Sequence, residues 1–266
     1  VANTWEKIYN RTMDEKIRIN KYLSDIGVCS RREADRLIES GRVTVDGKRA
    51  VPGMHVSENQ IVKVGKKTVH TGNERIVLAV NKPVGIICTE DRRTKNNIIR
   101  FLDYPQRITY AGRLDKDSEG LLIMTNDGDL INRMMRARYA HEKEYKVTVD
   151  RPLTDAFIRE MSEGVHITDK EKKLDAVTRP CKVTKIGKYT FSIVLTQGLN
   201  RQIRRMCSAL GYEVKKLVRT RIMNIELKDL KTGATRKLTD QELKELYEQT
   251  ETGTNAGAGN ASEPRS

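Results

Sequence analysis

The sequence predicts an α+β fold, in which a small N-terminal domain of two helices and short strands precedes a larger domain built on a mostly antiparallel sheet flanked by helices. The chain has 266 residues, more than the ~100–200 residues of a usual single domain. Helical spacing of apolar residues comes first along the chain, and short strand-like runs alternate with helical runs after residue 76. Between them, residues 65–75 are rich in Lys, Thr and Gly, which is typical of a linker. We expect an extension at 1–15, a small domain at 16–70, a larger domain at 74–248 and a disordered tail at 249–266.

The small domain begins with two predicted helices. Met13 comes directly before the first of them, and we hypothesise that it is the natural start of the protein. Apolar residues with helical spacing mark this helix up to Gly27, a residue type that often ends helices: Ile19, Tyr22, Leu23 and Ile26. Ser30 and Glu33 form a capping-box pattern that predicts the start of the second helix, and Gly41 predicts its end.

The rest of the small domain is predicted to form short strands. Residues 42–45 alternate in a strand-like pattern, and the pair Asp46–Gly47 that follows is typical of a tight β-hairpin turn. Residues 60–64 predict another short strand.

The larger domain shows apolar strand-like runs with helical runs between them. The strand-like runs are 76–83, 85–89, 121–126, 144–150 and 189–198. The helical runs are 97–102, 129–138, 154–162 and 200–210. This mixture favours an α+β domain around a mostly antiparallel sheet. From about Thr250 the chain contains no large apolar residue, so we expect a tail without a core.

The composition indicates a polyanionic partner. The chain carries 50 Lys and Arg residues against 36 Asp and Glu, a net charge of +14, and binding to phosphates releases counterions. A basic surface kept for solubility is the alternative. No apolar run approaches the ~20 residues of a membrane helix, and the N-terminus has no apolar signal-peptide core. The four cysteines are scattered without a CxxC pair, which disfavours zinc and disulfide frameworks and favours a cytoplasmic protein.

Segment 110–130 contains the residues that we expect to carry the chemistry. Asp115 lies in a loop between two strand-like runs, a common location for a functional side chain. An Asp in a polar loop is more often a turn former. The pairs Asp115 with Asp117 and Asp127 with Asp129 raise the alternative of a metal site, but no fuller series of ligands accompanies them.

Several motifs, in order along the chain, resemble one enzyme family. The segment GRLDKDSEGLLIMTNDGDL is similar to the signature of the RsuA-type pseudouridine synthases. Three more segments resemble motifs of the same family: LAVNKPVGIICT, HEKEYKVTVD and QGLNRQIRRMCSALGYEVKKLVRTRI. The RluF-type branch of this family resembles the chain most closely. The segment RINKYLSDIGVCSRREADRLIESGRVTVDGKRA resembles the alpha-L RNA-binding domain, and the whole resemblance spans about residues 17–245.

The resemblance implies the pseudouridine synthase fold and the isomerisation of uridine to pseudouridine in 23S large-subunit ribosomal RNA. This reaction breaks the bond between the ribose anomeric carbon and the base nitrogen, turns the uracil and rejoins it through a ring carbon. It changes no oxidation state and transfers no group from a donor, so no cofactor is expected. The chain also contains no P-loop, GxGxxG or zinc-ligand motif.

The resemblance also assigns roles to single residues. Asp115 corresponds to the catalytic carboxylate, Arg204 to the cation that keeps it charged, and Tyr145 to the aromatic residue that stacks on the flipped uridine. Leu217 resembles the apolar wall of the family's pocket. The residues alone leave other roles open, because Arg204 also fits a phosphate contact and Tyr145 and Leu217 also fit core positions of strands. Whether Asp115 attacks the base or the sugar, or removes a ribose proton, also stays open.

Basic residues of both domains are predicted to contact RNA phosphates. In the small domain they are Arg31, Arg32, Arg36, Lys48 and Arg49. In the larger domain they are Arg113, Arg201 and Arg205. If residues 200–210 are helical, Arg201 and Arg205 share one face, and Arg204 is rotated by about 100° from Arg205. For any one of these residues, a solvated surface position is the alternative.

Three other functions compete with this interpretation. A non-catalytic RNA-binding factor of ribosome assembly would explain the charge and the small domain. The same reaction on small-subunit ribosomal RNA or on tRNA would use the same motifs. A metal-dependent RNA nuclease is disfavoured, because carboxylates and histidines are not clustered. The expected partner is therefore large-subunit ribosomal RNA or its assembly intermediate, with no membrane partner, and we expect a monomer.

Overall fold

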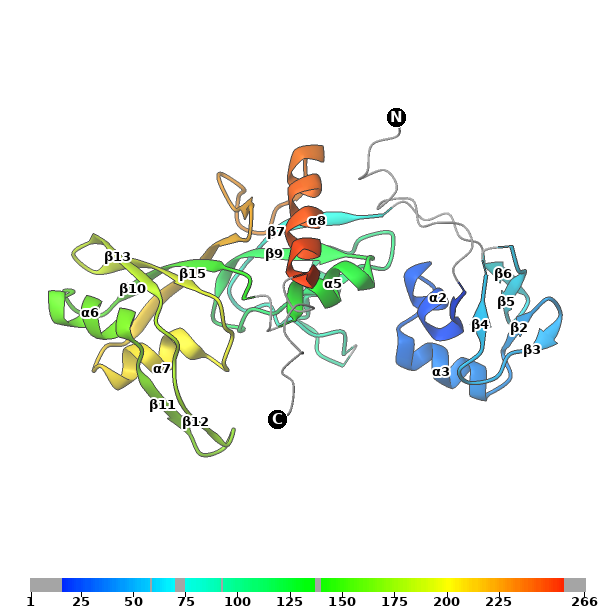
Figure 1. Cartoon of the computed structure of the whole chain (residues 1–266), viewed down its shortest axis with the longest axis horizontal. Coiled ribbons are helices and arrows are strands. Elements are labelled where there is room, and N and C mark those ends of the chain that lie inside the picture. Colours follow the sequence, from blue (N-terminus) through cyan, green and yellow to red (C-terminus); the bar gives the residue numbers. More distant parts are fainter. Residues whose placement is uncertain (1–15, 58, 70–74, 92, 137–139, 256–266) are drawn as a thin grey trace, which may run out of the picture. The chain divides into compact units, whose positions relative to one another are not determined.

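The computed structural model describes residues 16–57, 59–69, 75–91, 93–136 and 140–255 (Figure 1). The chain divides into two compact units. The first runs up to Val77 and adds two short segments, Asp103–Thr109 and Thr125–Asp129, and the second holds the rest. The predicted extension, with Met13, lies outside the described residues.

The described residues of the smaller unit form two helices and two small antiparallel sheets. The helices are α2 (Ile19–Asp25) and α3 (Arg31–Glu39). One sheet pairs β1 (Ile17–Arg18) with β4 (His55–Val56), and the other has the order β3-β2-β5-β6, formed by Lys48–Arg49, Val43–Val45, Val62–Val64 and Lys67–Val69. The predicted cap is confirmed, because the Ser30 hydroxyl accepts the Glu33 N–H at 3.2 Å. The predicted linker is wrong at 67–69, which pair with β5 as a strand.

In the described part of the second unit, nine strands form one large sheet. Seven of them follow the order β13-β14-β10-β15-β9-β7-β17, while β16 pairs with β15 and β8 with β9. Their bounds are β7 Val77–Lys82, β8 Thr109–Ala111, β9 Glu119–Thr125, β10 Lys143–Val149, β13 Lys182–Gly187, β14 Thr190–Leu195, β15 Val214–Ile222, β16 Ile225–Glu226 and β17 Thr235–Lys237. The β13-β14-β10-β15 neighbours and the β7-β17 pair are antiparallel, and β15 runs parallel to β9. The predicted mostly antiparallel α+β fold is confirmed.

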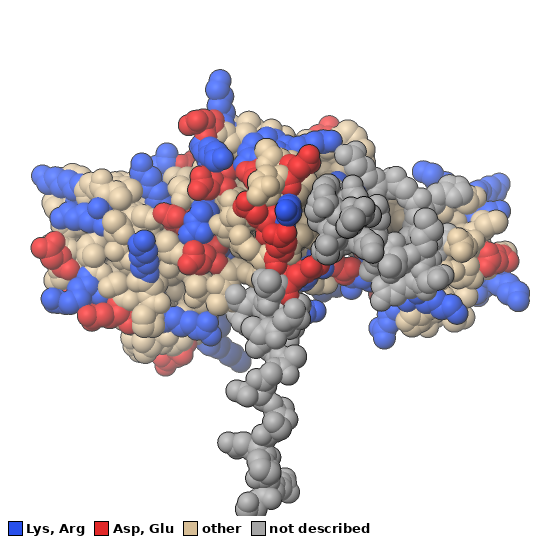
Figure 2. All heavy atoms as spheres, turned by 45° about the horizontal axis from the view of Figure 1, so that its top comes forward, with Lys and Arg blue, Asp and Glu red and all other residues tan. Residues whose placement is uncertain are grey.

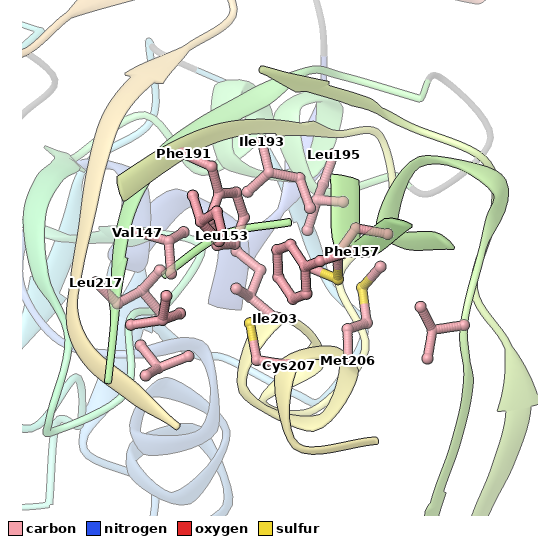
Figure 3. Packing of buried hydrophobic residues seen from close by; sticks show 14 of the residues in the cluster. Val147, Leu153, Phe157, Phe191, Ile193, Leu195, Ile203, Met206, Cys207 and Leu217 are labelled. Carbon is pink, nitrogen blue, oxygen red and sulfur yellow. The ribbon is translucent and has the colours of Figure 1, made fainter. Parts of the chain in front are cut away.

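Helices cover the sheet, and one of them packs the core beside the site. The helices are α4 (Ile98–Leu102), α5 (Gly128–Met135), α6 (Asp155–Glu163), α7 (Gln202–Ala209) and α8 (Asp240–Asn255). Apolar residues of α6 and α7 pack against β10, β14 and β15 (Figure 3). Phe157 and Phe191 meet edge to face in this core, with ring centroids 5.3 Å apart. A separate hairpin, β11 (His166–Asp169) with β12 (Leu174–Val177), follows α6.

Two expectations for the larger unit differ from the structure. Residues 85–89 form a loop, in which Ile87 makes an isolated bridge to Asn97. Gly85 has a φ of 92°, so the chain turns where a strand would continue. The predicted tail begins inside α8, which continues to Asn255 because Thr250 is fully buried. Within the described ranges, no helix combines the length and apolar composition that a bilayer-spanning segment requires.

Candidate active site

Asp115 lies in the loop between β8 and β9, in the larger unit. Two backbone hydrogen bonds hold this loop: the Ser118 N–H donates to the Asp115 carbonyl at 3.2 Å, and the Gly85 N–H donates to the Lys116 carbonyl at 2.7 Å. The Asp115 side chain is 33% exposed. The loop therefore presents a carboxylate that a substrate can reach, on a backbone that two neighbouring segments support.

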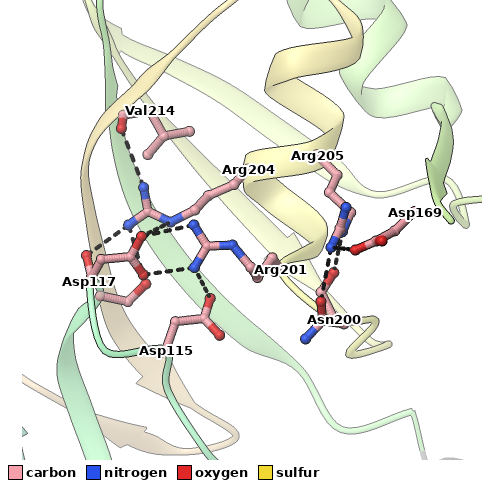
Figure 4. Close-up of polar contacts among 9 residues, drawn as sticks. Asp115, Asp117, Asp169, Asn200, Arg201, Arg204, Arg205 and Val214 are labelled. Atoms are coloured by element: carbon pink, nitrogen blue, oxygen red, sulfur yellow. Dashed lines mark hydrogen bonds and ion pairs between the residues drawn. The ribbon is translucent and has the colours of Figure 1, made fainter. Parts of the chain in front are cut away.

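The first residue before α7 brings a guanidinium to this loop (Figure 4). Arg201 precedes the helix in a left-handed conformation with φ 51°. It donates two hydrogen bonds to the Asp117 carboxylate, at 3.0 and 2.8 Å. Its Nη1 also lies 3.8 Å from Oδ2 of Asp115, within ion-pair distance but beyond a hydrogen bond.

Arg204 contacts a different part of the same loop. Its Nη2 donates to the Asp117 carbonyl at 2.7 Å, its Nη1 to the Val214 carbonyl at 3.3 Å, and its Nε lies 3.4 Å from the Asp117 carboxylate. The sequence assigned the ion pair with Asp115 to Arg204. In the described part of the chain that ion pair belongs to Arg201, because Arg204 lies in the first turn of α7, where its side chain reaches the loop backbone.

Asp117 and Arg201 each favour the charged form of the other. The hydrogen bonds from Arg201 hold the pKa of the Asp117 carboxyl below its ordinary value, and the charge of Arg204 adds to this effect. The same hydrogen bonds to Asp117 raise the pKa of Arg201. Both groups are therefore ionised at neutral pH, and a permanent positive charge lies beside Asp115.

Two buried cations, which the sequence reasoning missed, support the loop from inside. Lys82 is 0% exposed, and its Nζ donates to the Pro83 and Ile86 carbonyls, both at 2.8 Å. Burial lowers the pKa of Lys82, and the charges of Asp115 and Asp117 oppose this shift. A lysine at the end of the apolar strand VLAVNK was the available signal.

The second buried cation is Arg219, which is 2% exposed. Its Nε donates to the Leu121 carbonyl at 2.7 Å and its Nη1 to the Arg113 carbonyl at 3.4 Å. The Arg113 carbonyl precedes Asp115 and the Leu121 carbonyl follows it, so one guanidinium connects both ends of the Asp115 loop. Beside it, a Cβ on Gly120 would lie 2.4 Å from the Arg219 carbonyl oxygen, so only glycine permits this close approach of β9 to β15.

The pairing register of three strands gives the position of Tyr145 relative to the Asp115 loop. Tyr145 of β10 lies opposite Arg219 of β15, which in turn lies opposite Gly120 of β9. Two strand spacings place Tyr145 about 10 Å from β9, and its half-buried ring packs against the core. Leu217 is 6% exposed and lies opposite Val147 in the same core, as a strand core residue does.

The remaining predicted RNA contacts have different surroundings. Arg31, Arg32, Lys48 and Arg113 are exposed. Arg36 pairs with Glu33, and Arg49 donates to the Glu39 carbonyl at 2.9 Å. Arg205 is bound within the protein, to Asn200 and Asp169. On the face shown in Figure 2, Lys and Arg are widely spread over the described surface, so the charge on this face does not mark one RNA-binding patch.

The arrangement suits carboxylate chemistry. A reachable carboxyl group at Asp115, next to the guanidinium of Arg201, can act as a nucleophile or as a base. Among the residues that the structure describes, no group of three His, Cys, Asp or Glu side chains could hold a metal ion.

Comparison with known proteins identifies two family matches. Residues 76–209 match the RNA pseudouridylate synthase family, and residues 17–62 match the S4 domain family. The larger match covers the Asp115 loop, Tyr145 and the whole of α7. The smaller match covers the segment that resembled an alpha-L RNA-binding domain.

Individual relatives agree with these matches. The chain is 51% identical to the dual-specificity RNA pseudouridine synthase RluF of Shigella flexneri and 50% identical to that of Escherichia coli K12, each over 88% of this chain and 79% of the relative. It is 35% identical to the ribosomal large subunit pseudouridine synthase B of Bacillus subtilis, over 90% of this chain and 99% of the relative. A crystal structure of a pseudouridylate synthase superimposes with a TM-score of 0.62 at 27% identity, covering 86% of this chain and 99% of that one.

Proposed function

The chain belongs to the RNA pseudouridylate synthase family, and on this premise we propose that it isomerises uridine to pseudouridine in 23S large-subunit ribosomal RNA, with Asp115 as the catalytic carboxylate. The observation that carries the assignment of Asp115 is its place in the loop between β8 and β9. There it is one-third exposed and lies 3.8 Å from a guanidinium. We propose no cofactor, because the bond from the ribose to the base nitrogen is exchanged for a bond to carbon five, while carbon five loses a proton and the nitrogen gains one.

The reaction needs an ionised carboxylate next to a flipped nucleotide. Attack on the uridine and removal of a ribose proton both use a lone pair of Asp115. A carboxylate that loses water on substrate binding becomes harder to keep ionised. Arg201 opposes this effect by its charge, and Arg204 holds the loop in position through the Asp117 carbonyl.

Tyr145 supplies the surface on which the flipped base stacks. Flipping a nucleotide out of its helix costs a few kcal/mol, and stacking on an aromatic ring recovers part of this cost. The strand register supports this role, because Tyr145 lies across β15 from Gly120 at the start of β9, the strand that follows the Asp115 loop. We also keep Arg113 as a phosphate contact, since its side chain is exposed two residues before Asp115.

The names of the relatives support the choice of RNA. The Bacillus subtilis relative is named for the large ribosomal subunit, which favours 23S ribosomal RNA as the substrate. Two other relatives are called dual-specificity enzymes, which favours a second RNA substrate, for which tRNA is our candidate. Exposed Arg31, Arg32 and Lys48 of the S4 domain would position the RNA through its phosphates.

Tritium release tests this proposal directly. Ribosomal RNA that contains carbon-five-tritiated uridine should lose label with the wild-type protein, because the new glycosidic bond forms at that carbon. Asp115→Asn should bind the same RNA with unchanged affinity and release no label. Turnover by Asp115→Asn near the wild-type rate would reject Asp115 as the catalytic group, and chemical mapping of pseudouridine in a strain that lacks the gene identifies the target uridine.

A further inference from the structure

The β11–β12 hairpin ends in a turn rich in lysine. Residues 170–173 have the sequence KEKK, and all four side chains are exposed. The hairpin lies outside the large sheet, as a two-stranded sheet of its own. Three lysines in four residues repel one another, and Glu171 offsets only one of these charges. A turn of this composition needs other contacts to hold one conformation.

Asp169 supplies those contacts and connects the turn to α7. One carboxylate oxygen accepts the Lys172 N–H at 3.1 Å, which closes the turn. The other oxygen accepts a hydrogen bond from Nη2 of Arg205 (Figure 4). Arg205 also donates to the Asn200 carbonyl at 2.9 Å and to the Asn200 amide oxygen at 3.0 Å. Since Asn200 directly precedes Arg201, the turn is linked by contacts to the residue that lies beside Asp115.

The base of the hairpin is fixed as well. Ile167 is 2% exposed and belongs to the core that α6 and α7 form with the sheet. Thr178, directly after β12, donates its N–H to the Val165 carbonyl at 3.0 Å, and its hydroxyl accepts the Val165 N–H at 2.9 Å. The lysine turn is therefore held at its tip by Asp169 and at its base by the core.

We propose that the β11–β12 hairpin is an RNA-binding arm, whose Lys170, Lys172 and Lys173 contact phosphates of the strand that carries the target uridine. The Asp169–Arg205 pair holds this turn at a fixed place relative to Arg201 and Asp115. A turn ordered in advance loses less conformational entropy when it binds, so more of the free energy of its phosphate contacts contributes to RNA affinity. The inference rests on the proposed function in taking RNA as the partner.

The test removes the three charges and compares the result with a matched control. The arm variant is Lys170→Gln, Lys172→Gln, Lys173→Gln. The control variant changes three exposed lysines of the same unit that lie in the β13–β14 turn, in the loop before β17 and in α8: Lys188→Gln, Lys231→Gln and Lys244→Gln. Dissociation constants for a ribosomal RNA fragment are measured between 50 and 300 mM salt, concentrations of the order over which such affinities change strongly. Each phosphate contact on a single strand contributes about 0.7 to the slope of log K against log salt.

We expect the arm variant to lower this slope by about two units, to raise KM and to leave kcat unchanged. The control should keep the wild-type slope, and the melting temperatures of both should match the wild type because the changed side chains are exposed. Asp169→Asn should keep the slope, since all lysines remain, and raise KM because the turn is no longer held by Arg205.

Three results would overturn the inference: a wild-type slope in the arm variant, an equal loss of slope in the control, or a loss of kcat at unchanged affinity. The slope of log K against log salt measures RNA binding, whereas tritium release measures turnover. If the wild-type protein released no tritium from any ribosomal RNA, the proposed function would fail while the slope still decided the role of the arm.

Discussion

Replacing Arg201 by Gln removes the guanidinium that lies 3.8 Å from Asp115. Two unit charges about 4 Å apart attract each other by about 1 kcal/mol in water and by about 4 kcal/mol near a protein surface. Because the two side chains are 40% and 33% exposed, we take the lower part of this range, about 1–2 kcal/mol. About 1.4 kcal/mol corresponds to a tenfold change in rate. We therefore expect kcat to fall about tenfold in Arg201→Gln.

The free energy of unfolding should change less in Arg201→Gln than in Arg204→Gln, which is the matched comparison. The Arg201–Asp117 pair is partly exposed, and such pairs contribute less than about 1 kcal/mol to the free energy of unfolding. Arg204 is 15% exposed and donates to the Asp117 and Val214 carbonyls. A hydrogen bond that involves a charged group contributes about 1.5–3 kcal/mol. Arg204→Gln should therefore lower the free energy of unfolding as well as kcat.

Single-turnover tritium release at saturating enzyme gives the rate, and urea unfolding gives the stability. The reasoning is refuted if Arg201→Gln keeps the wild-type rate. A variant Arg204→Gln that loses its rate at unchanged stability would restore the assignment made from the sequence, in which Arg204 is the charge partner of Asp115.

Two more predictions concern stability. Gly120→Ala should lower the free energy of unfolding by about 3 kcal/mol or more, because its Cβ would lie 2.4 Å from the Arg219 carbonyl oxygen at a φ of 108°. Gly187→Ala is the control and should change it by less than about 1 kcal/mol, since its nearest neighbour would be 3.8 Å away; equal effects in urea unfolding would contradict this. The second prediction concerns the dependence of stability on pH. The pKa of Glu144 is lowered from its usual 4.5, mainly by the hydrogen bond from Ser192. The stability that ionised Glu144 contributes is present above pH 4.5 and is lost as the pH falls through the lower pKa that Glu144 has in the folded protein. The free energy of unfolding of Glu144→Gln should therefore fall less steeply with decreasing pH than that of the wild type. An unchanged dependence on pH in the acid range would contradict this prediction.

Local signals were enough to predict a helix or strand when the cap or the apolar spacing that defines it lies within its own residues. Ser30 caps α3 as its spacing to Glu33 indicated, and the apolar spacing of the first helix lies on its buried side, with Tyr22 and Leu23 at 2% and 0% exposure. The apolar run of β9 predicted a strand that is buried along almost its whole length. In each case neighbouring residues alone determine the pattern.

Elements that depend on distant contacts were missed. The hairpin sequence HITDKEKKLDAV has too many charges to predict a strand, and it forms because Ile167 enters a core made by other elements. Helix α8 continues past the predicted boundary because Thr250, polar in type, is buried. Neither burial can be inferred from the local sequence.

At the site, too, some features follow from the local sequence and others depend on distant contacts. The local sequence was enough to predict that Asp115 lies in a loop between two strands, and a motif made it the candidate carboxylate. The choice between Arg201 and Arg204 depended on a left-handed residue before α7, and no local pattern predicts that conformation for an arginine. The buried charges of Lys82 and Arg219 are visible only once β7 and β15 are placed in the sheet.

The way in which Asp115 and Asp117 share Arg201 has a chemical consequence. A guanidinium bonded to both oxygens of Asp115 would keep it charged, but it would also occupy the lone pairs that the reaction uses. Arg201 instead directs its two short hydrogen bonds to Asp117, at 3.0 and 2.8 Å, and remains 3.8 Å from Asp115. At that distance the attraction between the charges persists, whereas a hydrogen bond does not form. Asp117 therefore lets one arginine stabilise the carboxylate that we propose as catalytic without blocking it. This separation of charge from hydrogen bonding leaves the lone pairs of Asp115 available to attack or deprotonate a nucleotide, as the proposed function requires.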